Sequence, residues 1–221
     1  MNKIQHIIWD WNGTLVDDTW LFTDLINIVL KKRGLPTISI LDYKNKFCFP
    51  LEKYYKRLGF DFKKEDYNIP SLEFIKLYND NKYRPKLYSG MPELIHQLNK
   101  KSIKNYLLSA QNHDSLMDQI NFYKIKNLFQ TISGTDNLHA RGKNRLATNL
   151  LRSEKINKNG VLFIGDTNLD MELALQNEAK AVGVTYGHQS KHRFLNSRDI
   201  FLCDSTISLK TYLVSKLLEN Q

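Results

Sequence analysis

Residues 6–18 read HIIWDWNGTLVDD, and this stretch decides how the chain is expected to fold. The apolar run 6–9 ends at an acid, Asp10, and the pair Asn12-Gly13 that follows is typical of a turn. We therefore expect a strand that carries Asp10 at its C-terminal end. Ligands of open α/β sheets bind at that edge. Asp10 is accordingly a candidate nucleophile, a candidate metal ligand, or both.

A second acidic segment has the same local form. Residues 161–170 read VLFIGDTNLD, in which an apolar run leads through a glycine to Asp166, and Asp170 follows four residues later. Carboxylates at two strand ends can converge on one divalent cation, and oxygen ligands of this kind suit Mg²⁺. The alternative is that Asp166 and Asp170 cap the N-terminus of a helix. Together with Asp10, we expect them to bind Mg²⁺.

The composition restricts the possible classes of protein. The chain has 221 residues, a formal net charge of +9 and two cysteines, Cys48 and Cys203, without metal-type spacing. No apolar run approaches the roughly 20 residues of a membrane span, and the scattered lysines form no recognisable nucleic-acid module. We expect a cytoplasmic protein, monomeric or homodimeric, that binds neither nucleic acid nor membrane. Its basic surface suits a small phosphorylated metabolite as partner.

Strands and helices alternate along the second half of the chain. Strands are expected at 104–108, 129–133, 161–164, 181–184 and 200–203, and helices at 92–101, 113–122, 143–152, 169–177 and 207–218. This alternation predicts an α/β fold, a Rossmann-like parallel sheet with helices on both faces. The stretch 17–87 reads as helical throughout and interrupts the pattern after the first strand. We expect a core of residues 1–16 and 88–221 and an inserted helical cap of residues 17–87.

Two further polar residues follow or precede apolar segments at the expected edge. Ser109 ends the strand 104–108, where its hydroxyl and the amides of Ala110 and Gln111 are candidate phosphate ligands, although serine also begins many helices. Lys143 opens a helix, a position unfavourable for a cation beside the helix dipole. An anionic site next to Lys143 would explain it, and an ordinary surface lysine is the alternative.

In their order and spacing, these motifs resemble the four motifs of the haloacid dehalogenase superfamily. The helical insert resembles the cap of the phosphoglycolate-phosphatase-like group, and the resemblance covers the whole chain. The matching residues are Asp10-x-Asn12-Gly13-Thr14-Leu15, then Ser109, then Lys143, then Gly165-Asp166-Thr167-x-x-Asp170.

The resemblance implies a Mg²⁺-dependent phosphatase that acts on a small phosphorylated metabolite. Asp10 is then the nucleophile and forms an aspartyl-phosphate. The metal ligands are expected to be Asp10, the backbone carbonyl of Asn12, Asp166 and Asp170. The phosphoryl oxygens are expected to contact Thr14, Ser109, Ala110, Gln111 and Lys143, and the ammonium of Lys143 offsets the repulsion between carboxylate and phosphate.

Asn12 departs from the family pattern, because phosphatases of this family usually have an aspartate there as general acid and base. An amide cannot exchange a proton near neutral pH. The proton is then supplied by His188, His113, a cap residue or the substrate, or the leaving group is already a good one. The alternatives are a phosphonate (C–P) hydrolase, or an impaired relative that binds phosphate ligands or acts as a regulatory protein. A dehalogenase fits less well because Asp166 and Asp170 are present.

Overall fold

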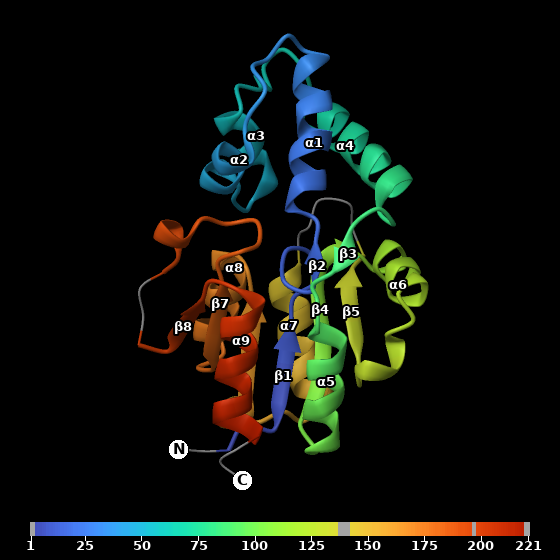
Figure 1. Ribbon diagram of the computed structural model, residues 1–221. Helices are drawn as coiled ribbons and strands as arrows, with labels where there is room; N and C mark the ends of the chain where they lie inside the picture. The colour runs from blue at the N-terminus through green and yellow to red at the C-terminus, as the bar shows by residue number, and fades with distance from the viewer. Residues whose placement is uncertain (1–2, 137–141, 196–197, 219–221) are drawn as a thin grey trace.

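The computed structural model describes residues 3–136, 142–195 and 198–218. Its main sheet contains β1 (His6–Trp9), β4 (Lys104–Asn112), β5 (Ile132–Thr135), β6 (Val161–Gly165), β7 (Lys180–Val184) and β8 (Ile200–Cys203). The strands are parallel and lie in the order β5-β4-β1-β6-β7-β8 (Figure 1). Along the chain, β4 and β5 extend the sheet on one side of β1, and β6, β7 and β8 then extend it on the other side. Such a reversal beside β1 is where doubly wound sheets bind ligands.

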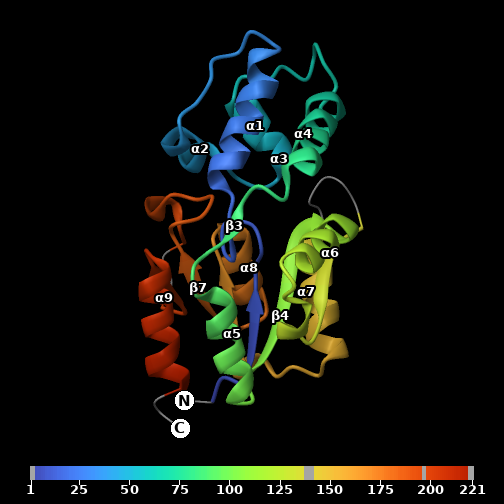
Figure 2. The same cartoon turned by 45° about the vertical axis from the view of Figure 1, so that its right-hand side comes forward.

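Helices cover both faces of this sheet (Figures 1 and 2). One face packs against α5 (Met91–Lys100), α6 (His113–Phe122) and α9 (Thr206–Leu213), and the other against α7 (Lys143–Ser153) and α8 (Asn168–Gln176). Successive residues of a strand point to opposite faces. In β1, Ile7 and Trp9 accordingly belong to the first core and Ile8 to the second, and all three side chains are buried. The predicted α/β fold with helices on both faces is confirmed.

Four helices are inserted after β1 and lie beyond the C-terminal ends of the strands, opposite the two termini (Figure 1). They are α1 (Thr19–Lys31), α2 (Ile40–Lys46), α3 (Leu51–Arg57) and α4 (Asn68–Asn81). The short antiparallel pair β2 (Val16–Asp17) and β3 (Lys86–Leu87) connects them to the sheet. The arrangement supports the division into a core of residues 1–16 and 88–221 and a cap of residues 17–87, which stays a prediction.

Local signals account for the helix boundaries of the insert. After α1 the chain turns at Gly34, whose φ of 64° lies in the left-handed region that favours glycine. Ser39 precedes α2 and forms a reciprocal capping box with Asp42. Pro50 precedes α3, where its missing amide costs no helical hydrogen bond. The helices thus begin and end where the sequence provides stop and start signals.

The structure corrects the bounds of two strands. β4 continues to Asn112, beyond the predicted end at residue 108, because Asn112 pairs with Thr135 after a register shift. β5 begins at Ile132 rather than at residue 129. Phe129 is buried in the core as expected of an apolar residue, but it follows a 3₁₀ turn at Lys126–Leu128 instead of joining the ladder. Burial and strand pairing are separate properties, and the sequence pattern reports mainly the first.

The final helix is also shorter than predicted. It ends at Leu213, and a π-helical segment follows at Val214–Leu218. By contrast, the helix at 113–122 and the strand at 200–203 have the predicted bounds. Within the described ranges, no helix has both the length and the apolarity needed to cross a bilayer.

Candidate active site

Strand register brings the two acidic motifs to the same edge. Trp9 of β1 is in register with Leu107 of β4 and Ile164 of β6. The amide of Asp10 then donates to the carbonyl of Ile164 at 2.8 Å, which extends the pairing by one residue. Because β6 ends just beyond Ile164, Asp166 leaves the sheet beside Asp10.

Three acids meet at this edge. Oxygen atoms of Asp10, Asp166 and Asp170 all lie within 4.8 Å of one another. The side chain of Asp10 keeps 11% of its surface exposed and that of Asp170 keeps 5%, while Asp166 is 1% exposed as a whole residue. Three buried carboxylates so close together repel one another unless cations are present.

Asp170 caps a helix and also belongs to the acidic cluster. Its Oδ2 accepts hydrogen bonds from the hydroxyl of Thr167 at 2.8 Å and from the Thr167 amide at 3.1 Å, which is a capping box at the start of α8. Its other oxygen, Oδ1, belongs to the acidic cluster and accepts from Lys143 Nζ at 2.6 Å. Helix capping therefore fixes the orientation of this carboxylate through Oδ2 and leaves Oδ1 available to the cluster.

Lys143 supplies a cation to the cluster. It is the first residue of α7 and only 4% exposed, and its Nζ contacts both Asp10 Oδ1 and Asp170 Oδ1. Burial alone would lower the pKa of Lys143, but the attraction of Asp10 and Asp170 outweighs it and raises this pKa above its usual value. The unusual position at a helix start is explained by the acids, as the sequence suggested. The ammonium stays charged at neutral pH.

One ammonium does not balance three carboxylates. Burial raises the pKa of Asp10 well above its usual value, and the charges of Asp170 and Asp166 add to this effect. Burial likewise raises the pKa of Asp166 to about 6, against the opposing influence of His188. A hard divalent cation held by carboxylate oxygens would relieve this excess of negative charge. The donor set therefore fits Mg²⁺.

Two glycines make this close packing possible. A Cβ on Gly13, whose φ is 71°, would lie 2.2 Å from Asp166 Oδ2. A Cβ on Gly165 would lie 2.2 Å from the carboxyl carbon of Asp170. Both distances are far below van der Waals contact, so either side chain would displace an acid from the cluster.

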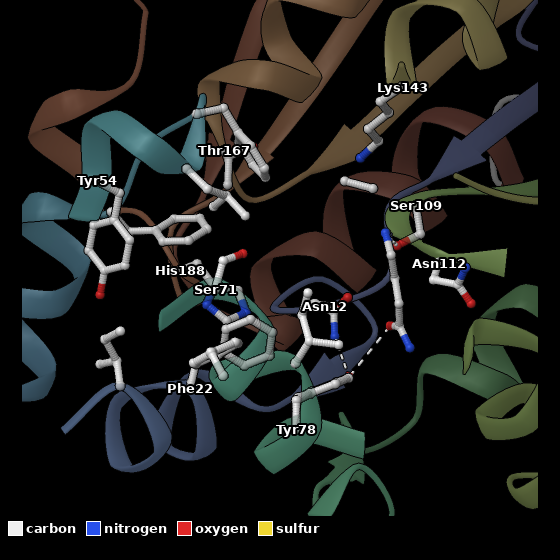
Figure 3. A pocket seen from close by; sticks show the side chains of 18 of the residues that line it. Asn12, Phe22, Tyr54, Ser71, Tyr78, Ser109, Asn112, Lys143, Thr167 and His188 are labelled. Carbon is white, nitrogen blue, oxygen red and sulfur yellow. Dashed lines mark hydrogen bonds between the residues drawn. The ribbon is translucent and has the colours of Figure 1, made fainter. Parts of the chain in front are cut away.

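Asn12 is hydrogen-bonded within the protein through its amide. Its Nδ2 donates to Asp18 Oδ2 at 2.6 Å and to the hydroxyl of Tyr78 at 2.9 Å. Tyr78 belongs to α4, so this bond links the loop after β1 to the inserted helices (Figure 3). Both partners accept from an N–H group, which a carboxylate at this position would not provide.

Asp18 and Tyr43 are two residues that the sequence reasoning did not include in the site. Asp18 is completely buried, and its Oδ1 accepts from the amide of Gly13 at 2.9 Å and lies 3.0 Å from His188 Nε2. His188 Nδ1 lies 2.8 Å from the hydroxyl of Tyr43 in α2. Burial alone would lower the pKa of His188, but the hydrogen bond and charge of Asp18 outweigh it and raise this pKa.

The sequence contains part of the information that places Asp18 and His188 in the site. Asp18 follows the first motif directly, and His188 lies in the loop after β7, whose C-terminal end faces the same edge. No sequence pattern connects these two residues with each other. His113, the other proton source considered, lies at the start of α6, where its Nδ1 accepts from the amide of Gly134 at 3.3 Å.

The residues expected to bind phosphoryl oxygens are only partly brought together. The cavity beside the acids is lined by Ser109, Ala110 and Gln111. The backbone amide of Gln111 donates to Ser109 Oγ at 3.1 Å. Thr14 does not line this cavity. It is fully buried, and its hydroxyl donates to Asp166 Oδ1 at 3.5 Å. A phosphate role for these residues stays a prediction.

The acids open into a cavity of about 190 Å³ that extends toward the inserted helices (Figure 3). Asp10, Lys143 and Asp166 form part of its wall at the sheet edge, and side chains of α1 to α4 form much of the rest. A buried, charged floor below an apolar chamber is the usual form of a small-molecule site.

Comparison with known proteins agrees with this geometry. The family model described as "Haloacid dehalogenase-like hydrolase" matches residues 7–184, which include all the motifs named above. The chain belongs to this family. The resemblance inferred from Asp10, Ser109, Lys143 and Asp166 is therefore confirmed, and the chain is a hydrolase of the haloacid dehalogenase type.

Curated relatives of this hydrolase are distant but cover most of its length. It is 24% identical over 189 residues to a phosphoglycolate phosphatase from Synechococcus elongatus, covering 85% of this chain and 87% of that protein. It is also 24% identical over 223 residues to a 5'-nucleotidase from Pseudomonas aeruginosa, covering 96% and 97% of the two chains. Among solved structures, a haloacid dehalogenase-like hydrolase from Streptococcus pneumoniae has a TM-score of 0.82 at 20% identity, covering 96% of this chain and 100% of that one.

Proposed function

We propose that this protein is a Mg²⁺-dependent phosphatase that hydrolyses a small phosphomonoester through an aspartyl-phosphate on Asp10. The observation that carries the proposal is the buried cluster of Asp10, Asp166, Asp170 and Lys143 at the floor of a cavity. The two curated relatives, a phosphoglycolate phosphatase and a 5'-nucleotidase, are by name enzymes of this reaction class.

Asp10 is suited to nucleophilic attack because only one of its oxygens is occupied. Lys143 contacts Oδ1, which leaves Oδ2 to form a bond to phosphorus. As that bond forms, the bond from phosphorus to the leaving oxygen breaks, and the leaving oxygen takes the electron pair. Water then attacks the aspartyl-phosphate, which releases inorganic phosphate and restores the carboxylate.

The other residues of the cluster offset the negative charge of the reacting groups. Asp10, Asp166, Asp170 and the Asn12 carbonyl are the expected ligands of Mg²⁺, which when bound neutralises negative charge on the phosphoryl group. Lys143 keeps its proton in the buried cluster and offsets the charge that accumulates as carboxylate and phosphate approach. Ser109 and the amides of Ala110 and Gln111 are the expected partners of the phosphoryl oxygens.

Asn12 determines which substrates the reaction suits. Its amide already donates to Asp18 and Tyr78, so it neither protonates a leaving group nor activates water. General acid–base help is worth about 10²–10⁴ in rate. A leaving group that departs without a proton avoids that loss. The same observation favours a second candidate function, a relative that binds phosphate ligands without turnover.

A comparison of wild type with Asp10→Asn separates the two candidates. Hydrolysis of an aryl phosphate is measured with Mg²⁺ and with chelator, and exposed Asp80→Asn in α4 serves as the matched control. Mg²⁺-dependent hydrolysis in wild type and Asp80→Asn, lost in Asp10→Asn, supports the phosphatase. Stabilisation by inorganic phosphate without turnover in any variant supports the binding protein. Turnover that survives in Asp10→Asn contradicts the proposed nucleophile.

A further inference from the structure

The part of the cavity formed by the inserted helices is mainly aromatic and aliphatic, with Ser71 and Asn79 of α4 as its short polar side chains. Its walls include Phe22 and Ile26 of α1, Phe47 after α2, Tyr54 of α3 and Phe74 of α4. Figure 3 shows Phe22 and Tyr54 on the side of the cavity away from Lys143. A ligand group in this chamber therefore exchanges water for aromatic surface, which favours a flat apolar group.

The charged side chains that line the cavity all belong to the sheet side. They are Asp10, Asp166 and Lys143, with His188 beside them. Nearby cations of the inserted helices are used elsewhere: Lys44 Nζ donates to backbone carbonyls at residues 185 and 186, and Arg57 donates to one at residue 46. Among the described residues, none of the lysines and arginines of α1 to α4 lines the chamber. A second anionic group on the substrate would be desolvated there without a cationic partner.

Resting on the phosphatase proposed above, we propose that the substrate is an aryl phosphomonoester whose uncharged ring occupies the chamber formed by α1 to α4. The whole cavity, including its part at the acids, measures about 190 Å³, and because an apolar cavity of roughly 150 Å³ holds a benzene ring, its size limits the apolar group to a single ring. A phosphate bonded directly to the ring places phosphorus at Asp10 and the ring among Phe22, Phe47 and Phe74.

The chemistry of position 12 leads to the same substrate class. When Asp10 Oδ2 bonds to phosphorus, the electron pair of the broken P–O bond leaves on the ring oxygen. A phenol has a pKa near 10, far below that of water or an aliphatic alcohol, so an aryl oxygen leaves as an anion far more readily than an alkyl oxygen. The aryl oxide then takes its proton from water after it departs. The absence of a general acid at position 12 therefore slows the hydrolysis of aryl phosphates less than that of alkyl phosphates.

A substrate series tests the ring and the leaving group separately. With wild type and Mg²⁺, kcat/KM is measured for phenyl phosphate, benzyl phosphate, ethyl phosphate, phosphoglycolate and a nucleoside 5'-monophosphate. Benzyl and ethyl phosphate differ in the ring, and we expect about 10- to 100-fold in favour of benzyl from burial of the ring. Phenyl and benzyl phosphate differ mainly in the leaving oxygen, and we expect at least about 100-fold in favour of phenyl. A higher kcat/KM for phosphoglycolate or for a nucleoside 5'-monophosphate than for phenyl phosphate overturns the inference.

A binding measurement separates failure of this inference from failure of the proposed function. Titration calorimetry with Mg²⁺ compares phenylphosphonate with methylphosphonate, neither of which has a P–O bond to a leaving group. We expect phenylphosphonate to bind about 10- to 100-fold more tightly, whether or not the protein turns over substrate. Equal affinities overturn the aromatic chamber and leave the phosphatase standing. Absence of turnover with this affinity ratio intact overturns the phosphatase alone.

A pair of variants locates the ring. Phe74→Leu removes an aromatic wall from the cavity, whereas Phe201→Leu makes the same change on β8, where Phe201 is 49% exposed and outside the cavity. We expect the affinity ratio of phenylphosphonate to methylphosphonate to fall at least about 5-fold in Phe74→Leu and to stay unchanged in Phe201→Leu. The same ratio in both variants contradicts the proposed position.

Discussion

Asn12 donates a hydrogen bond to Asp18 at 2.6 Å, so the amide that replaces the usual acid of this motif lies against a completely buried carboxylate. The same carboxylate accepts from the amide of Gly13 and faces His188. The residue at position 12 is therefore matched to Asp18. A carboxylate at position 12 would place two acids in contact and leave the hydroxyl of Tyr78 without its donor.

Asn12→Asp alone is expected to destabilise the protein. The new acid either repels Asp18 or takes up a proton, and we expect the free energy of unfolding at pH 7.5 to fall by about 1–3 kcal/mol. Urea unfolding followed by circular dichroism measures the change. A matched control is Asn149→Asp in α7, because the side chain of Asn149 is exposed. Unchanged stability of Asn12→Asp would contradict the account of the Asn12–Asp18 pair.

The double variant Asn12→Asp/Asp18→Asn is expected to recover most of that loss. The amide and the carboxylate exchange places, so the hydrogen bond between them runs in the opposite direction. The exchange also returns a general acid to position 12, and we expect hydrolysis of an alkyl phosphate to rise by about 10-fold or more. The coupling energy from the four proteins and kcat for ethyl phosphate are the two measurements. If the losses in stability of the two single variants simply add in the double variant and kcat does not rise, the proposed exchange of roles between positions 12 and 18 is wrong.

Asp166→Asn is expected to stabilise the metal-free protein and to abolish stabilisation by Mg²⁺. Burial raises the pKa of Asp166 to about 6, so its charged form is held at a cost at pH 7.5. Removing the charge should raise the free energy of unfolding by about 1–3 kcal/mol. Thermal unfolding with chelator and with Mg²⁺ tests both effects, with Asp80→Asn as control. If Asp166→Asn keeps the full response to Mg²⁺, Asp166 is not a ligand.

The effect of Mg²⁺ on stability is expected to depend on pH. The pKa of Asp166 is raised in the folded state, so its contribution to stability is complete below the unfolded value near 3.9 and is lost as pH rises through about 6. Asp10 shifts in the same direction. Because the metal requires deprotonated acids, the rise in melting temperature caused by Mg²⁺ should be larger at pH 7.5 than at pH 5. Equal shifts at the two pH values would count against a carboxylate site.

Lys143→Met is expected to destabilise the metal-free protein by about 3–5 kcal/mol, because it removes the buried cation that contacts Asp10 and Asp170. Loss of Lys143 should also abolish turnover. The control is Lys101→Met, an exposed lysine after α5, which should change stability by less than about 0.5 kcal/mol. Chemical unfolding in chelator measures both variants. A small effect of Lys143→Met would mean that the acids are protonated in the folded protein.

Much of the framework could be predicted from local patterns. Apolar runs that end in Asp10 and Asp166 identify two strands and the edge to which they point, since parallel strands align their C-terminal ends. The position of Lys143 at a helix start also indicated an acidic neighbour. The bounds of β4 were less predictable, because Asn112 joins the ladder through pairing with Thr135 and not through its own propensity.

The pairings around Asn12 could not be predicted in this way. His188 is separated from Asp18 by 170 residues and from Tyr43 by 145. Tyr78 lies 66 residues from Asn12. No periodicity connects positions so far apart in the chain, and only the packing of α2 and α4 over the sheet brings them together.

The sequence by itself determined the α/β fold, the insertion of helices after the first strand, and the acids and lysine of the cluster. These features depend on short-range signals: apolar runs, turn residues and the residue that follows each strand. The tertiary structure decided that Asp170 both caps α8 and joins the acidic cluster, that Asn12 is bound to Asp18, and that aromatic residues such as Phe74 line a chamber. Helical apolar spacing shows that a side chain is turned away from water, and only the packing of neighbouring helices determines whether it faces a filled core or a cavity.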